Sequence, residues 1–240
     1  MCNDSGAAAS APEAERIGTS GGRRGTSGLP SVRVMTIVLA DPRVAAVPLL
    51  DCGEALVPLP DRLGTGVWVR EGLATRLVRA DAALPPGMRL SVVEGHRSIA
   101  DQARIIDRYA TQVRAHHPGV EEPELGRLVS RFVAPLDVAP HVAGAAVDLT
   151  LVDGAGTPYD LGTPIDATPE QSDGACYYAA TGIPPIARFL RHLLGEALRG
   201  SGLVNYPTEW WHWSYGDRYW ALVTGADRAI YGPVEAEAAA

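Results

Sequence analysis

Cysteine, phenylalanine and long apolar runs are all scarce in this chain of 240 residues. Cys2, Cys52 and Cys176 are too few and too scattered for a disulfide framework, and none belongs to a Cys-x-x-Cys pair. This usage is typical of a reducing compartment. No run approaches the roughly 18 apolar residues of a membrane span, and no segment reads as a signal peptide. We therefore expect a cytoplasmic protein that makes no membrane contact.

Positive charge is also in short supply. The formal net charge is -7, and no run of Lys or Arg stands out against it. Proteins that bind nucleic acid usually carry a basic patch, often interleaved with aromatic residues. The sequence therefore predicts no nucleic-acid partner and favours a small-molecule substrate.

Hydrophobic residues make up 46% of the chain and charged residues 20%, which suffices for one substantial core. Residues 1–34 are rich in Gly, Ala, Ser and Arg and lack a hydrophobic period. We expect them to be a disordered or loosely attached extension. Residues 35–240 are predicted to form a single domain.

Hydrophobic periodicity indicates helices and strands in alternation. Val67–Ala82, Ile99–Ala115 and Ile186–Leu198 read as helices, and the last should bury an apolar stripe that includes Ile186 and Phe189. Met88–Val93 and Ala145–Val152 read as strands. The predicted fold class is α+β, with a small central antiparallel sheet flanked by helices.

Two segments carry side chains suited to a metal. Glu209 stands three residues before His212, and His141 stands seven residues before Asp148. A catalytic zinc ion usually takes three ligands from His, Asp, Glu or Cys. His141, Asp148 and His212 could supply them and leave Glu209 free as a general base.

Backbone geometry sets conditions on this arrangement. Residues seven apart point to opposite faces of a regular strand, so His141 and Asp148 converge only if the chain bends, which Gly144 allows. Glu209 and His212 face the same difficulty at a spacing of three. We expect an irregular strand or bulge there.

Other residues of these types have simpler roles. His192 falls off the apolar stripe of its helix, while His116 and His117 suit the end of another helix. His96 is left without a role. Large aromatics dominate burial, so at least one of the tryptophans around His212 should belong to the core.

The paired segments resemble the zinc D-alanyl-D-alanine dipeptidases of the vancomycin-resistance type and their relatives among peptidoglycan D,D-peptidases. The family pattern His-x-x-Gly-x-Ala-x-Asp matches residues 141–148, and Glu-x-Trp-His matches residues 209–212. The resemblance is expected to cover residues 45–225. It implies that residues 35–240 are a catalytic metallopeptidase domain.

The resemblance also implies roles for single residues. His141, Asp148 and His212 would bind one zinc ion per chain, with Glu209 as the general base. Arg97 matches the arginine that stabilises the transition state in the family, although its neighbours Glu94, His96 and Ser98 differ from the usual residues.

Substrate recognition is the second part of what the resemblance implies. Asp166 looks like the family's acidic residue near the substrate ammonium. Ala139 stands where many relatives have a serine. The expected activity is hydrolysis of D-Ala-D-Ala to D-alanine. The alternatives are a D,D-carboxypeptidase or endopeptidase acting on longer peptidoglycan peptides, and a non-catalytic zinc-stabilised binding domain.

Overall fold

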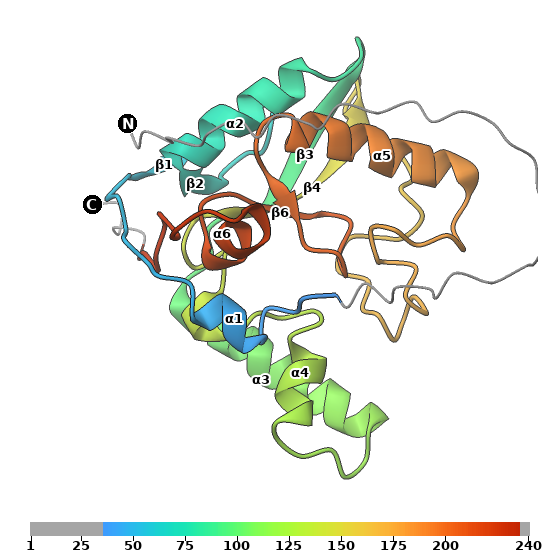
Figure 1. Cartoon of the computed structure of the whole chain (residues 1–240). Helices are drawn as coiled ribbons and strands as arrows, with labels where there is room; N and C mark the ends of the chain where they lie inside the picture. Colours follow the sequence, from blue (N-terminus) through green and yellow to red (C-terminus); the bar gives the residue numbers. More distant parts are fainter. Residues whose placement is uncertain (1–35, 236–240) are drawn as a thin grey trace, which may run out of the picture.

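A four-stranded antiparallel sheet forms the centre of the molecule (Figure 1). The computed structural model describes residues 36–235. The strands of both sheets in the structure are β1 (Leu56–Pro58), β2 (Trp68–Arg70), β3 (Met88–Glu94), β4 (Ala146–Asp153), β5 (Val204–Asn205) and β6 (His212–Ser214). The central sheet has the order β3-β4-β6-β5, while β1 and β2 pair separately. All the strand pairs are antiparallel.

Helices cover the two ends of this sheet. They are α1 (Pro42–Ala45), α2 (Glu71–Ala82), α3 (Ile99–His116), α4 (Glu124–Val129), α5 (Pro185–Arg199) and α6 (Arg218–Thr224), with a 3₁₀ turn at Leu136–Val138. In the view of Figure 1, α2 and α5 lie toward the top, and α1, α3 and α4 gather below the sheet. The predicted α+β class with a flanked antiparallel sheet is confirmed.

Strand β4 is the most deeply buried element of the sheet. Seven of its eight residues are buried because β3 and β6 pair with its two edges and side chains cover both faces. The surrounding core takes in Trp210, Trp211, Trp213 and Trp220, which confirms the expected core role of the tryptophans. The strand that carries Asp148 is therefore held from every side.

The predicted helix Val67–Ala82 is wrong at its start. Trp68–Arg70 forms β2, and α2 begins only at Glu71. An aromatic residue followed by a β-branched one favours extended backbone, and here it finds a partner strand in β1. The predicted helix at Ile99–Ala115 is confirmed as α3, which Ser98 caps by accepting a hydrogen bond from Asp101 N at 3.0 Å.

Helix α5 is present as predicted, but the face that it buries is rotated. Ile186 and Phe189 are 61% and 58% exposed, whereas Leu194 is fully buried. The buried face centres on Arg191, whose guanidinium donates to the carbonyls of residues 161, 175 and 177. The apolar pattern alone could not place a buried arginine at the middle of this face.

The segment 229–234 closes the fold against the start of β4. Arg70 donates to the carbonyls of Gly232 at 3.0 Å and Ala143 at 2.9 Å. Val234 N donates to the Val142 carbonyl at 3.0 Å. His96 Nε2 donates to the Val234 carbonyl at 2.7 Å. This C-terminal segment therefore braces the turn that leads into β4.

Three further expectations concern the N-terminal extension, membrane contact and the cysteines. The predicted extension, residues 1–34, lies outside the described residues. Between residues 36 and 235, no helix has the length and apolar character needed to span a bilayer. Cys176 is a buried free thiol, whereas Cys52 is disulfide-bonded. The expected cytoplasmic location stays a prediction.

Candidate active site

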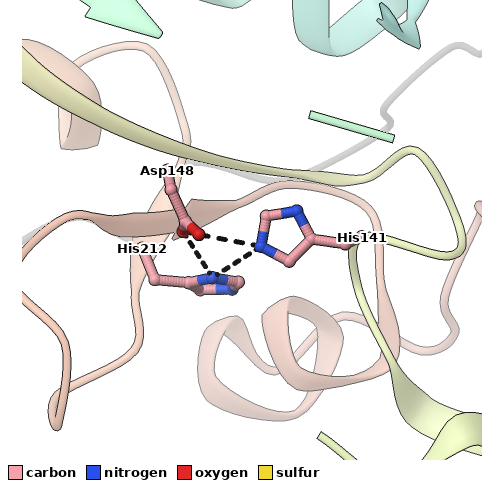
Figure 2. Close-up of side chains that lie close together, drawn as sticks. All are labelled: His141, Asp148 and His212. Atoms are coloured by element: carbon pink, nitrogen blue, oxygen red, sulfur yellow. Dashed lines mark hydrogen bonds and ion pairs between the residues drawn. The ribbon is translucent and has the colours of Figure 1, made fainter. Parts of the chain in front are cut away.

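Three side chains with metal-binding atoms meet at the centre of the sheet: His141, Asp148 and His212 (Figure 2). Asp148 lies on β4 and is paired in register with His212, the first residue of β6. Directly paired residues of antiparallel strands project their side chains to the same face. Pairing between β4 and β6 thus brings together two residues that are far apart in the chain.

A tight turn brings His141 to the same place. Gly144 N donates to the His141 carbonyl at 3.0 Å, and Ala145 N donates to the Pro140 carbonyl at 3.0 Å. Gly144 has φ 64°, a left-handed conformation that glycine adopts at little energetic cost. The predicted bend between His141 and Asp148 is therefore present at Gly144.

The distances within this cluster suit a zinc ion. His212 Nδ1 lies 3.0 Å from Asp148 Oδ1 and 3.1 Å from His141 Nε2, and the His141–Asp148 distance is 3.5 Å. Tetrahedral zinc with bonds of about 2.0–2.2 Å separates its ligand atoms by roughly 3.3–3.5 Å. The 3.5 Å separation lies in this range and the other two fall slightly below it, so two histidines and one aspartate are spaced closely enough to share one zinc ion.

The tautomer of His141 supports the same arrangement. Its Nδ1 donates to the Gly95 carbonyl at 2.8 Å, which leaves the Nε2 lone pair directed at His212 and Asp148. A carbonyl partner on the opposite ring nitrogen is the usual orientation of a metal-binding histidine. Burial opposes ionisation of Asp148, but the two histidines hold the pKa of its carboxyl below the usual range. The carboxylate is thus in the form that binds cations.

Glu209 lies beside the cluster without belonging to it. Its Oε2 is 3.9 Å from His212 Nδ1, and its Oε1 is buried without a hydrogen-bond partner. Burial, with the charges of Asp148 and Asp166, raises the pKa of Glu209 well above its usual value. An unpaired carboxylate oxygen in this position is free to accept a proton from a reacting water.

The backbone before His212 is a turn followed by a strand. Glu209 N donates to the Tyr206 carbonyl at 3.0 Å, and β6 starts only at His212. The expected irregular strand is therefore wrong at Glu209, which lies in a turn. The expected departure from regular strand geometry between Glu209 and His212 is present. Asn205 fixes the turn because its Nδ2 donates to the carbonyls of Glu209 at 2.8 Å and His212 at 2.9 Å.

Arg97 follows β3 and is held rigidly. Its Nε donates to Glu94 Oε1 at 2.8 Å, Nη2 donates to Glu94 Oε2, and Nη1 donates to Gln102 Oε1 at 2.7 Å. Gln102 is only 1% exposed and donates in turn to the Ala134 carbonyl. A guanidinium has five N–H groups, so two remain for a ligand.

A single cavity of about 390 Å³ connects these residues. His141, Asp148, Glu209, Arg97 and Asp166 all line it. The structure therefore brings together the whole set of residues that the sequence singled out. Their chemistry, a metal cluster with a neighbouring carboxylate and arginine, suits hydrolysis of a polarised carbonyl.

Asp166 occupies the exposed rim of this cavity. Its φ of 64° places a non-glycine residue in the left-handed region, which aspartate tolerates better than most residues do. Within residues 36–235 its carboxylate has no hydrogen-bond or ion-pair partner. Ala139, which also lines the cavity, offers only a methyl group.

The remaining histidines lie elsewhere, and two site residues were not anticipated. His192 is exposed on α5, and His96 is directed at the C-terminal segment. Gln102 and Asn205 were missed because their amide contacts depend on loops that only the fold places nearby. The position of Gln102, five residues after Arg97 on the predicted helix, was the one available signal.

Comparison with known proteins agrees with this geometry. A family model described as D-ala-D-ala dipeptidase matches residues 68–228, a range that starts later than the expected 45–225. The D-alanyl-D-alanine dipeptidase of Synechocystis sp. is 29% identical in an alignment 216 residues long, and the match covers 73% of this chain and 87% of the relative. The Escherichia coli protein of the same name is 39% identical over 72 residues, 30% of this chain and 35% of the relative.

A solved structure also resembles the chain. It is a mutant of the vancomycin resistance D,D-pentapeptidase VanY from a VanB-type resistance cassette, in complex with Zn(II). The TM-score is 0.44 and the sequence identity 18%, over 74% of this chain and 86% of that chain.

Proposed function

Since the chain belongs to the D-ala-D-ala dipeptidase family and is a zinc metallopeptidase, we propose that it hydrolyses the D-Ala-D-Ala dipeptide to D-alanine. The observation that carries this proposal is the unpartnered carboxylate of Asp166 at the rim of the cavity that also holds the metal cluster. The free ammonium of a dipeptide is the complementary charge, and charge-assisted hydrogen bonds are among the stronger polar contacts.

The metal and its base come from different side chains. His141, Asp148 and His212 would hold the zinc ion, which when bound polarises a carbonyl and lowers the pKa of water. Glu209 takes the proton of the attacking water through the oxygen that has no partner and passes it to the leaving amine. Zinc binding and proton transfer are therefore separable by mutation.

Arg97 supplies positive charge where the carbonyl oxygen becomes negative. Glu94 and Gln102 occupy three of its N–H groups and fix the plane of the guanidinium. The two remaining N–H groups stay available for the oxyanion, and donors fixed in advance do not have to reorganise during the reaction. Glu94 and Gln102 act on the reaction only by positioning Arg97.

A second candidate function is cleavage of longer peptides that end in D-Ala-D-Ala. The cavity continues along α3 past Gln102 to Gln112. These ten residues correspond to about 15 Å of helix, whereas two extended residues span only about 7 Å. The length of the cavity thus leaves room for a substrate longer than the dipeptide.

A panel of substrates tests the proposal. The zinc-loaded protein should release D-alanine from D-Ala-D-Ala and leave L-Ala-L-Ala intact, and N-acetyl-D-Ala-D-Ala should react at least about 10-fold more slowly. Asp166→Asn preserves shape and tolerance for the left-handed backbone but removes the charge. This variant should reduce the preference for the free over the acetylated dipeptide, chiefly by raising the KM of the free dipeptide.

The contrary results are equally clear. Equal handling of the free and acetylated dipeptides by the unmutated protein would reject the dipeptidase proposal in favour of the longer-peptide activity. Absence of hydrolysis in the whole panel, with zinc bound, would leave a non-catalytic zinc-stabilised domain.

A further inference from the structure

The cavity has an arm that the proposed reaction does not use. Beyond Gln102, it is lined by Ile105, Tyr109 and Gln112, which follow at spacings of three or four residues on one face of α3. Phe132, Thr168 and Gln171 line it from the neighbouring loops. The proposed reaction needs only the end of the cavity near Arg97.

Ordered contacts form the wall of this arm. The rings of Tyr109 and Phe132 pack with centroids 4.9 Å apart. Tyr109 OH donates to Glu170 Oε2 at 2.9 Å, and Arg131 forms an ion pair with Glu170 at 3.5 Å. These contacts tie α3 to the loop after Asp166, so the arm has a fixed wall on which a peptide can lie.

Arg108 is the unusual residue of the arm. It lines the cavity and is exposed, and it has no hydrogen-bond or ion-pair partner within residues 36–235. Arg97, in the same cavity, is bound by Glu94, and Arg104, one turn earlier on α3, is paired with Asp101. Arg108 is therefore a guanidinium available to an anionic ligand.

We propose that the arm of the cavity along α3 is a subsite for residues on the amino-terminal side of D-Ala-D-Ala, and that Arg108 binds a side-chain carboxylate of those residues. The inference rests on the proposed function, because it extends the same reaction to longer acidic peptides. Asp166 favours the free dipeptide through its ammonium, and Arg108 favours acidic extended peptides. Neutral extended peptides gain from neither residue.

The test uses isosteric peptides that differ in charge alone. Acetyl-Glu-Gly-D-Ala-D-Ala and acetyl-Gly-Glu-D-Ala-D-Ala are compared with their Gln counterparts, with D-Ala-D-Ala as the reference for each variant. The unmutated enzyme should prefer one Glu peptide over its Gln counterpart by about 10-fold in kcat/KM, which corresponds to about 1.4 kcal/mol. Calorimetric binding of acetyl-Glu-Gly-D-Ala and acetyl-Gly-Glu-D-Ala against their Gln counterparts supplies a readout without turnover.

Variants on α3 identify the residue responsible. Arg108→Gln should bring the Glu and Gln peptides to within about 2-fold of each other, and Arg108→Glu should reverse the preference. Arg104→Gln, the matched control outside the cavity, should keep the preference. The drop in preference for the Glu peptide that Arg108→Gln causes should be smaller at high salt, because salt screens exposed charges.

Different failures point to different errors. Equal rates and equal binding for Glu and Gln peptides in the unmutated protein would overturn the subsite while D-Ala-D-Ala hydrolysis upholds the proposed function. A preference that survives Arg108→Gln would likewise overturn the assignment to Arg108. Lack of hydrolysis of D-Ala-D-Ala and every peptide would refute the proposed function, and in that case the binding measurement alone decides the subsite.

Discussion

The two histidines of the metal cluster allow the site to be tested one residue at a time. His141→Ala or His212→Ala removes one of three ligands, so bound zinc should fall well below one per chain and hydrolysis should be lost. Metal content by mass spectrometry and the dipeptide assay measure both effects. His192→Ala, on the exposed side of α5, is the control and should keep both zinc and activity. Tightly held zinc in both ligand variants would remove this site from consideration.

Glu209 should behave differently from the ligands because it is not one of them. Glu209→Gln keeps the size of the side chain but cannot accept a proton, so turnover should fall by roughly 100-fold or more while zinc stays bound. Parallel metal analysis and initial rates check this. Turnover near that of the unmutated protein would exclude Glu209 as the base.

At the scale of single residues, the sequence predicted which side chains converge but not what holds them. His141, Asp148, Glu209 and His212 carry distinctive chemistry at distinctive spacings, which a pattern can reveal. Gln102 gives no such signal, because its value lies in two contacts, to Arg97 and to the Ala134 carbonyl, that form only when α3 meets the following loop.

At the scale of elements, the turn before β4 is the most sensitive point. Gly144→Ala forces a Cβ into the left-handed region and to within 2.5 Å of Leu56 Cδ2. Gly156→Ala is a matched control, since its φ is also positive but open space surrounds it. Both should lose about 1–2 kcal/mol of unfolding free energy from backbone strain, and Gly144→Ala should lose more.

Zinc affinity separates the two glycine variants further. Gly144 N supports the His141 carbonyl, so Gly144→Ala should weaken zinc binding, whereas Gly156→Ala should not. Urea unfolding and a zinc competition assay measure the two quantities. Equal zinc affinity in both variants would show that the turn tolerates a side chain without moving His141.

Helix and strand boundaries were predictable where local preference and packing agree. Ser98 and the apolar period located α3 to within one residue of its observed end. Local preference and packing disagree at Trp68, where strand pairing delays the start of the helix to Glu71. They also disagree at Ile186 and Phe189, which α5 leaves exposed because its buried face centres on Arg191. Such choices depend on partners that are distant in the sequence.

At the scale of the whole molecule, the fold class followed from alternating short strands and amphipathic helices. The pairing of β6 with β4 could not be predicted in this way, because β6 has only three residues and its register depends on the buried strand beside it. The arm along α3 also depends on a long-range contact, the one between Tyr109 and Glu170. Neither a strand order nor a groove between distant segments can be read from local patterns.

The contacts from Val234 to Val142 and from Arg70 to Gly232 matter for where the folded unit ends. The family match ends at residue 228, yet residues 229–234 hold the turn beside His141 from outside that range. A chain ended after residue 228 should lose about 2–4 kcal/mol of stability and bind zinc more weakly than one ended after residue 235. Thermal unfolding and zinc titration of the two chains compare them directly. Expression boundaries drawn from the family match alone would therefore omit part of the structure that shapes the active site.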